Sequence, residues 1–378
     1  MPTPFEPFTA GSLTLPNRIV RAACGERMAD LQGRVGHDLL AYMDGLARGG
    51  AGLIILGHGY VRRDGRLTDN ETGLDRDDQI PRLRLIAQQI QRRGARACLQ
   101  VSHGGRQCRP VVIETTPLAP SPIEVLKTGV VPRELAGEEV PALVADFVRA
   151  AGRVREAGFD AVQIHAAHGY LISQFLSPAT NRREDEWGGD PPRRRRFLLE
   201  VIRGIRTALG PDYPLLLKMN LDDCIPGGIP LEEALAAAAA AGEVGIDALE
   251  VSGGMVDSAK GAARKEIVPG RQEAYFRPLA RAARAVLDVP LILVGGIKSP
   301  ETVQDLIESG DVDLVALGRP LIREPRLPLE WLDGRQTPAD CRSCNRCALY
   351  KDRPLCCESL ALEQERMAEA EAIGPAAS

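Results

Sequence analysis

The chain has 378 residues, of which 44% are hydrophobic and 26% charged, and its formal net charge is −4. This composition is ordinary for a soluble globular enzyme, and the charge gives no bulk attraction to nucleic acid or another polyanion. Aromatic residues make up only 4%, and no apolar run approaches the length of about 20 residues that spans a membrane. The N-terminus lacks a signal-peptide pattern, so we expect the nine cysteines to lie in the reducing cytoplasm, where clustered cysteines typically bind metal.

Eight short apolar runs recur along the chain and predict eight strands. They are RIVRAA (18–23), GLIIL (52–56), ACLQV (97–101), AVQIH (161–165), LLLKM (215–219), ALEVS (248–252), LILVG (291–295) and LVALG (314–318). Most are apolar at consecutive positions, which is typical of parallel strands buried on both faces.

Helix-length segments separate these runs. HDLLAYMDGLARGG places Leu39, Leu40, Met43 and Leu46 on one helical stripe and ends on glycine. RRFLLEVIRGIRTALG and PLEEALAAAAAAGEVG have the same pattern. The alternation of strand and helix therefore predicts an α/β fold, namely a (β/α)8 TIM barrel.

The expected division of the chain is a barrel over residues 1–335 and a Cys-rich tail over residues 336–378. A doubly wound sheet is disfavoured because no GxGxxG motif follows a strand. For the same reason we expect no dinucleotide-binding domain in this chain.

In barrels of this kind the chemistry lies at the C-terminal ends of the strands. The residues that follow these ends and could serve a ligand are Ala22, Ala23, Cys24, His58, Gln100, His165, His168, Tyr170, Lys218, Gly295, Gly296, Gly318 and Arg319. The small residues after the first strand would let a flat ligand press on the backbone.

Several of these side chains suit a flavin mononucleotide (FMN). The glycines at 295–296 and Gly318–Arg319 follow the seventh and eighth strands, where converging N–H groups and an arginine suit a phosphate, although tight turns alone would also explain the glycines. Lys218 ends an apolar strand and needs an anionic partner, either Glu250 or a ligand. Gln100 can both donate and accept hydrogen bonds at a heterocycle edge.

The segment IHAAHGY leaves three alternatives open for His165 and His168. They could be packed or solvated histidines, or a zinc pair for which no third ligand is obvious. As neutral imidazoles, both could instead donate hydrogen bonds to one carbonyl oxygen, and Tyr170 could then supply a proton.

The stretch HAAHGYLISQFLSPATNRREDEWGG resembles the signature of the old yellow enzyme family. LPNRIVRAA, GGAGLIILGHGYV, LQVSHGGRQ, VGGIKSPE and LVALGRPLI follow the family's landmarks in the same order. The resemblance covers nearly the whole chain and is closest to the FMN-binding barrel of the 2,4-dienoyl-CoA reductase type (NADH:flavin oxidoreductase), without the extra nucleotide-binding domains.

The resemblance implies an FMN at the barrel mouth, reduction by NAD(P)H, and hydride transfer to the C=C bond of an α,β-unsaturated carbonyl compound. It implies that His165 and His168 hold the carbonyl oxygen and that Tyr170 protonates the α-carbon. The implied cofactor contacts are Ala22, Ala23, Cys24, His58, Gln100, His165, Lys218, Gly295, Gly296, Gly318 and Arg319. The chain departs from the family at Arg27, where some members have a substrate-contacting tyrosine, and either Cys24 or Gly25 could face flavin N5.

The segment CRSCNRCALYKDRPLCC offers Cys341, Cys344, Cys347 and then Cys356 or Cys357 as metal ligands, with Cys356 the one we name. It resembles the cluster segment of bacterial 2,4-dienoyl-CoA reductase and trimethylamine dehydrogenase, although the gap to the fourth cysteine is shorter here. A 4Fe–4S cluster, a structural zinc and free thiols remain as alternatives.

The expected function is that of an NAD(P)H-dependent FMN ene reductase or dienoyl reductase acting on a small molecule. The alternatives are a flavin-dependent amine dehydrogenase, a flavin or cluster electron-transfer subunit, and a flavin-free lyase that uses Lys218 as a Schiff base. We expect neither nucleic acid nor a membrane as partner. Assembly of the chain into a homo-oligomer is left open as an alternative to a monomer.

Overall fold

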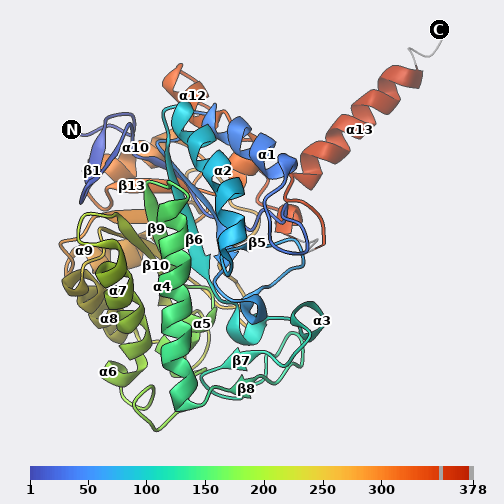
Figure 1. Cartoon of the computed structure of the whole chain (residues 1–378). Coiled ribbons are helices and arrows are strands. Elements are labelled where there is room, and N and C mark those ends of the chain that lie inside the picture. Colours follow the sequence, from blue (N-terminus) through green and yellow to red (C-terminus); the bar gives the residue numbers. More distant parts are fainter. Residues whose placement is uncertain (349–351, 374–378) are drawn as a thin grey trace.

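The computed structural model describes residues 1–348 and 352–373, and its centre is a closed barrel of eight parallel strands (Figure 1). The strands are β3 (Ile19–Arg21), β4 (Leu53–Tyr60), β6 (Arg96–Ser102), β9 (Ala161–Ala166), β10 (Leu215–Asp222), β11 (Ala248–Gly253), β12 (Leu291–Val294) and β13 (Leu314–Leu317). Neighbours in this order pair with each other, and β13 pairs with β3 to close the ring. Every predicted run overlaps one of these strands, so the predicted barrel is confirmed.

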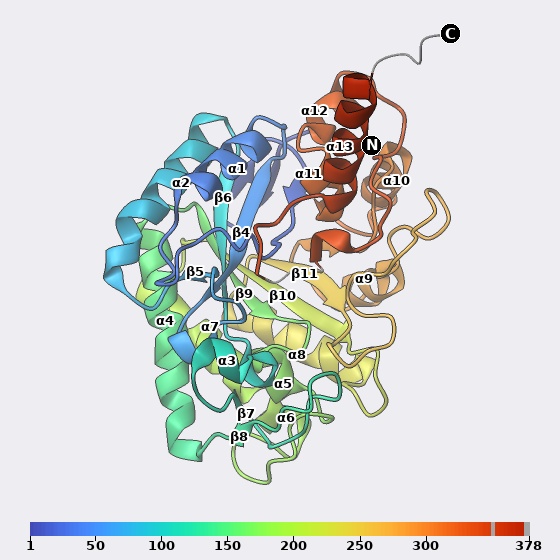
Figure 2. The ribbon, with the colours of Figure 1, turned by 90° about the vertical axis from the view of Figure 1, so that its right-hand side faces the viewer.

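Helices cover the outside of the barrel (Figures 1 and 2). The longer ones are α1 (His37–Ala47), α2 (Ile80–Arg92), α4 (Val140–Glu156), α7 (Arg196–Leu209), α8 (Leu231–Val244), α9 (Arg277–Arg284) and α10 (Pro300–Glu308). Shorter ones are α5 (Leu171–Leu176), α6 (Pro191–Arg194), α11 (Arg319–Arg323) and α12 (Leu327–Leu332). No helix among the described residues has the length and apolar character that crossing a membrane requires.

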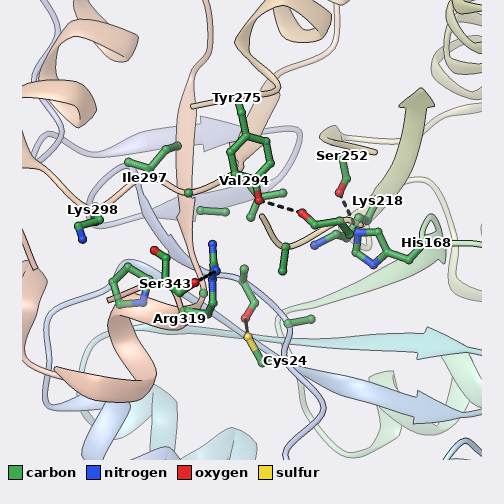
Figure 3. Close-up of a pocket in the computed structure, with 18 residues that line it drawn as sticks. Cys24, His168, Lys218, Ser252, Tyr275, Val294, Ile297, Lys298, Arg319 and Ser343 are labelled. Atoms are coloured by element: carbon green, nitrogen blue, oxygen red, sulfur yellow. Dashed lines mark hydrogen bonds between the residues drawn. The ribbon is translucent and has the colours of Figure 1, made fainter. Parts of the chain in front are cut away.

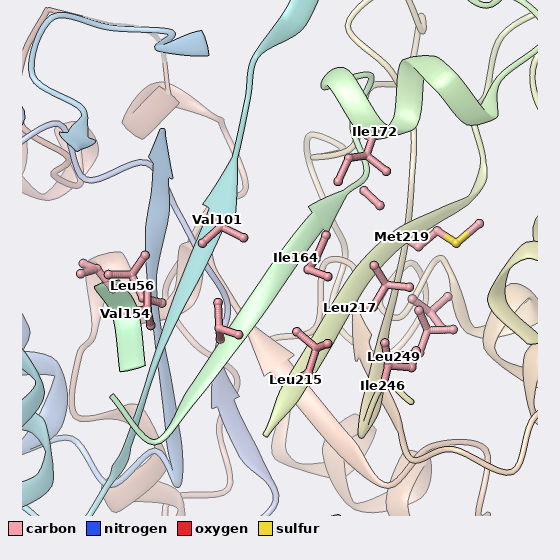
Figure 4. Packing of buried hydrophobic residues seen from close by; sticks show 14 of the residues in the cluster. Leu56, Val101, Val154, Ile164, Ile172, Leu215, Leu217, Met219, Ile246 and Leu249 are labelled. Atoms are coloured by element: carbon pink, nitrogen blue, oxygen red, sulfur yellow. The ribbon is translucent and has the colours of Figure 1, made fainter. Parts of the chain in front are cut away.

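Two apolar clusters hold the barrel together. The larger one fills the space between strands and helices, where outward-facing Ile164, Leu217 and Leu249 pack against the helical layer (Figure 4). The smaller one fills the inside of the barrel with Leu53, Ile55 and similar residues from every strand. Because the side chains of a strand alternate between its two faces, each apolar run supplies both clusters.

An N-terminal hairpin closes one end of the barrel. Its strands β1 (Phe8–Ala10) and β2 (Leu13–Leu15) pair antiparallel, and Ala10, Leu13 and Leu15 belong to the inner cluster. The hairpin packs onto the lower, apolar part of the interior. The opposite end, where the strands terminate, is therefore the end that is free to carry a site.

Two segments extend the βα repeat. The loop after β6 contains α3 (Pro110–Ile113), β7 (Leu118–Ala119) and β8 (Arg133–Glu134). After α12 the chain forms the tail, in which a single turn, η5 (Arg346–Ala348), precedes helix α13 (Glu358–Ile373). Helix α13 projects away from the barrel (Figure 1).

Candidate functional site

A cavity lies at the C-terminal end of the strands (Figure 3). It is lined by Ala22, Ala23, Cys24, His168, Lys218, Ser252, Ala262, Ala263, Tyr275, Val294, Gly296, Ile297, Lys298, Ala316, Gly318, Arg319, Pro320 and Ser343. We call this the mouth cavity. It brings together predicted residues from the first, fourth, fifth, seventh and eighth strands.

A chain of buried polar side chains runs under the mouth cavity. Lys218 Nζ donates to Glu250 Oε1 at 2.7 Å, and Glu250 is one of the two partners that the sequence left open. Gln163 Nε2 donates to the other Glu250 oxygen at 2.8 Å, and Gln163 Oε1 accepts from Gln100 Nε2 at 2.7 Å. All four residues are at most 4% exposed. The carboxylate holds the lysine charge in place, and the pairing satisfies a buried ion that would otherwise be costly.

The other end of the mouth cavity combines glycines with cations. Gly296 has φ of +74°, and a Cβ there would lie 2.7 Å from the Tyr275 ring, so only glycine fits. Arg319 Nη1 donates to the carbonyl oxygens of Arg264 at 2.7 Å and Ser343 at 3.3 Å, and to Asn345 Oδ1 at 2.6 Å. Lys298 Nζ donates to the Cys341 carbonyl at 2.6 Å.

The residues of the mouth cavity fit FMN. One end offers the glycine cradle and Arg319, which suit a phosphate, and the other offers the Lys218 cation for an electron-rich ring edge. The alanines at positions 22, 23 and 316 keep the wall between them flat. Among the predicted cofactor residues, Gly295 lies beside Gly296, whereas Gln100 and His165 lie buried behind the lining and His58 lies on a second cavity.

His165 and His168 lie at the start of the mouth, with ring centroids 5.0 Å apart. Burial lowers the pKa of both imidazoles well below the ordinary value. His168 lowers the pKa of His165 further, and the positive charge of Lys218 lowers the pKa of both rings. Both rings are therefore neutral near pH 7. His165 Nδ1 accepts from the Ala167 N–H at 3.1 Å, which places the ring proton on Nε2.

Ser252 fixes the second imidazole. Its Oγ lies 2.8 Å from His168 Nε2, and Asn220 Oδ1 accepts from the backbone N–H of His168 at 3.1 Å. His168 itself has φ of +59°, so this turn holds the ring in a conformation that few residues adopt. When the serine hydroxyl donates to Nε2, the His168 proton sits on Nδ1 and is free for a ligand.

Tyr170 lies on a second cavity next to the first. Its ring centroid is 4.7 Å from that of His165 and 5.2 Å from that of His58. Burial, with added repulsion from Glu71, raises the pKa of the phenol, so it is protonated at neutral pH. We call this the tyrosine cavity; its lining is Gly25, Glu26, Arg27, His58, Leu67, Thr68, Glu71, Thr72, Tyr170 and Ala348.

The loop after β3 separates the two cavities. Cys24 lines the mouth cavity, whereas Gly25 lines the tyrosine cavity. Arg27 donates to the carbonyl oxygens of Cys347 at 3.0 Å and Arg353 at 2.8 Å, so it binds the tail. The Leu355 N–H donates to the Glu26 carbonyl at 2.9 Å. The position at which some relatives have a tyrosine thus holds the Cys-rich segment in this chain.

The tail brings its cysteines to one small cavity. Cys341, Cys344, Cys347 and Cys357 all line it, together with Arg319 and Arg323 among others. Cys356, the residue we expected as the fourth ligand, is exposed and does not line this cavity, whereas Cys357 does. Within residues 1–348 and 352–373, no three His, Cys, Asp or Glu side chains converge as ligands of a single ion do.

Several residues of the site were not selected from the sequence. Gln163 had a signal, because it is a polar residue in an apolar run, two positions before His165 and on the same face. Ser252 had one as well, because it ends the sixth predicted strand. Tyr275 and Lys298 had none, since they follow no strand end directly and their partners lie far along the chain.

Comparisons with known proteins agree with this geometry. Residues 4–337 match the model of the NADH:flavin oxidoreductase / NADH oxidase family. An NADH oxidase from Thermoanaerobacter brockii is 38% identical over 91% of this chain and 53% of its own length. An NADPH dehydrogenase from Bacillus subtilis is 33% identical over 85% of this chain and 91% of its own length.

Solved structures show the same barrel. A 2-naphthoyl-CoA reductase in complex with 2-naphthoyl-CoA superposes with a TM-score of 0.88 and 28% identity, over 94% of this chain and 56% of that one. An old yellow enzyme homologue from Zymomonas mobilis superposes with a TM-score of 0.77 and 28% identity, over 94% of this chain and 100% of that one. The chain thus spans about half the length of the first relatives it matches.

Proposed function

Since the chain belongs to the NADH:flavin oxidoreductase / NADH oxidase family, we propose that it is an FMN-dependent enzyme that oxidises NAD(P)H and reduces the C=C bond of an α,β-unsaturated carbonyl compound. The observation that carries the proposal is the pair of neutral histidines beside a protonated tyrosine, next to a cavity that fits FMN. When bound, FMN supplies the hydride transfer between the nicotinamide and the β-carbon.

The histidine pair polarises the substrate. His165 Nε2–H and His168 Nδ1–H can both donate to one carbonyl oxygen, where negative charge grows as hydride reaches the β-carbon. Neutral imidazoles do this without a competing positive charge that the site would have to bury. Lys218, held by Glu250, lies on the same side of the mouth cavity as the histidines, beside His168 (Figure 3) and in register with His165 on the next strand.

Tyr170 completes the reduction by giving its proton to the α-carbon. Its raised pKa makes it an acid that is fully protonated at neutral pH. The phenol has His58 beside it, and His58 Nδ1 is bonded to Glu71 Oε1 at 2.8 Å, so a polar path for reprotonation leads to the tyrosine cavity.

The proposal is tested by separating the two half-reactions. The purified protein should bind FMN with absorption near 450 nm and be bleached by NAD(P)H. A Tyr170→Phe variant should keep this bleaching but reoxidise with an enone about 10² to 10⁴ times more slowly, because it lacks the general acid. Tyr213→Phe is the matched control, since that hydroxyl bonds the Phe159 carbonyl away from the mouth. Equal slowing of both half-reactions in Tyr170→Phe would refute the acid role.

We also propose that the tail binds a metal centre through Cys341, Cys344, Cys347 and Cys357. A 4Fe–4S cluster is our first choice for this centre, and a zinc ion is the second. The support is their shared cavity and a CxxCxxC spacing that clusters accept. Anaerobic purification followed by iron, sulfide and zinc assays tests it. Cys357→Ser should lose the metal and Cys356→Ser should keep it, and retention in both variants would overturn the ligand assignment.

The location we propose is a reducing compartment, the cytoplasm. All nine cysteines are free thiols in the structure, including those that lie close together in the tail. Cysteines kept for metal binding need a reduced state, which the cytoplasm maintains.

A further inference from the structure

The loop between β11 and α9 lies beside α9 at the barrel mouth (Figure 2), and its sequence is rich in positive charge. Residues 260–271, KGAARKEIVPGR, contain four cationic residues and one carboxylate, in a chain whose formal net charge is −4. The local excess therefore runs against the charge of the whole molecule.

These cations line an open groove with a volume of about 620 Å³. We call it the basic groove; its lining is Lys260, Arg264, Lys265, Glu266, Ile267, Arg271, Gln272, Glu273, Ala274, Tyr275, Arg277 and Pro278. The volume falls in the range of about 300 to 1,000 Å³ that sites for small molecules and cofactors occupy.

Four of the five cations in the basic groove are not neutralised. In the part of the chain that the structure describes, Lys260, Lys265 and Arg271 form no ion pair. Arg264 forms none either, and its guanidinium stacks 4.4 Å from the centre of the Tyr275 ring. Arg277 differs, because Asp305 and Asp311 bind it.

The carboxylates of the groove offset this charge only in part. Glu273 is bound in the groove wall, where it accepts from the Lys298 N–H at 2.6 Å and from Thr302 Oγ1 at 2.5 Å, and it keeps its negative charge. Glu266 is the other carboxylate of the lining. Four unpaired cations against two carboxylates leave a net positive site, which suits a ligand that carries negative charge.

The basic groove adjoins the mouth cavity. Tyr275 lines both, and its hydroxyl donates to the Ala262 carbonyl at 2.8 Å in the wall of the mouth. Arg319 Nη1 donates to the Arg264 carbonyl at 2.7 Å, so the groove loop is fastened to the phosphate end of the mouth cavity. A long ligand can therefore have one end in the groove and the other at the mouth.

We propose that the basic groove binds the phosphorylated adenosine end of a substrate, a ribose phosphomonoester with a 5′-diphosphate, whose reactive end enters the mouth cavity. NADPH and coenzyme A thioesters share this chemistry. The inference rests on the proposed function, since it takes a nicotinamide or an acyl group as the end that reacts.

The probes are 2′,5′-ADP for the NADPH end and 3′,5′-ADP for the coenzyme A end, titrated calorimetrically into the flavin-loaded protein. The double variant Lys265→Glu/Arg271→Glu should bind at least one probe ten or more times more weakly, and added salt should weaken binding to the native protein. Arg92→Glu is the matched control, an exposed arginine at the end of α2 on the opposite side of the barrel, and it should bind as the native protein does.

Turnover then assigns the source. A loss of kcat/KM that is much larger for NADPH than for NADH, which shares the 5′-diphosphate but lacks the phosphomonoester, assigns the groove to the hydride donor. A loss for a coenzyme A thioester, but not for the N-acetylcysteamine thioester of the same acid, assigns it to the acceptor. Unchanged affinity of the double variant for both probes, or no binding of either probe to the native protein at millimolar concentration, would overturn the proposal.

Failure of the proposed function would look different. If the native protein binds a probe through the groove but never oxidises NAD(P)H, the groove proposal stands and the proposed reductase function is wrong. The double variant should also retain FMN and its kcat with saturating NADH and a small enone. Loss of both would show that the groove residues support folding, and would overturn a separate binding role.

Discussion

The inside of the barrel consists of two layers that differ in chemistry although the same strands build both. The lower layer includes Cys98, Ala161, Leu216 and Ala248, which pack with the N-terminal hairpin. Two residues further along the same strands lie Gln100, Gln163, Lys218 and Glu250. Because side chains alternate, both sets point inward, and a step of 2 residues along a strand leads from the apolar layer to the polar layer. Both layers are buried, so the position of an inward side chain along the barrel axis, rather than its burial, decides whether it packs or serves the site.

The largest effect is expected from Lys218→Met, which replaces a charged residue of the upper, polar layer by an apolar one. Glu250 is 0% exposed and would lose its cation, which typically costs about 3–5 kcal/mol of unfolding free energy. Urea unfolding of the FMN-free protein measures it. The double variant Lys218→Met/Glu250→Gln should recover most of the loss, and a double variant as unstable as the single one would contradict the pairing argument.

A change in the lower layer should affect stability alone. Leu216→Ala leaves a void at a site that is 1% exposed, and we expect a loss of about 2–5 kcal/mol with kcat nearly unchanged in the folded fraction. Unfolding and turnover, measured on the same sample at low temperature, check both parts. A large fall in kcat with little loss of stability would mean that the lower layer also serves the chemistry.

The histidines above these layers make stability depend on pH. Burial keeps His165 and His168 neutral when folded, whereas they take up protons in the unfolded chain below about pH 6.5. The unfolding free energy should therefore fall as the pH drops below this value, by about 1.4 kcal/mol per histidine and pH unit. The slope from pH 6.5 to 5 should be flatter in His165→Asn/His168→Asn. Equal slopes would show that the rings are protonated in the folded protein.

The smallest effect is expected at Ser252, which touches the site only through His168. Ser252→Ala should weaken binding of a phenol ligand by about 0.5–1.5 kcal/mol, because the imidazole proton is no longer directed to Nδ1. Flavin charge-transfer absorbance on titration with a para-substituted phenol measures the affinity. Ser252→Thr, which keeps the hydroxyl, should retain it, and equal weakening in both variants would indicate a packing effect.

The sequence was sufficient to predict the barrel because parallel strands buried on both faces leave near-continuous apolar runs. It also pointed to the Lys218–Glu250 pair, since a lysine inside such a run needs a buried anion. Contacts between distant segments could not be predicted, and His168 with Ser252 is one of them, 84 residues apart. The choice between Cys356 and Cys357 likewise depends on which way a side chain points, which spacing cannot decide.

The loop from Cys24 to Arg27 has a thermodynamic consequence. Its residues contact the mouth cavity, the tyrosine cavity and, through Arg27, the cysteine tail. A ligand that shifts this loop changes the free energy of all three places at once. Linkage is reciprocal, so if filling the tyrosine cavity tightens binding of the proposed metal by the tail by some factor, metal loading would tighten binding in that cavity by the same factor. Metal occupancy of the tail would then be measurable as ligand affinity in the tyrosine cavity.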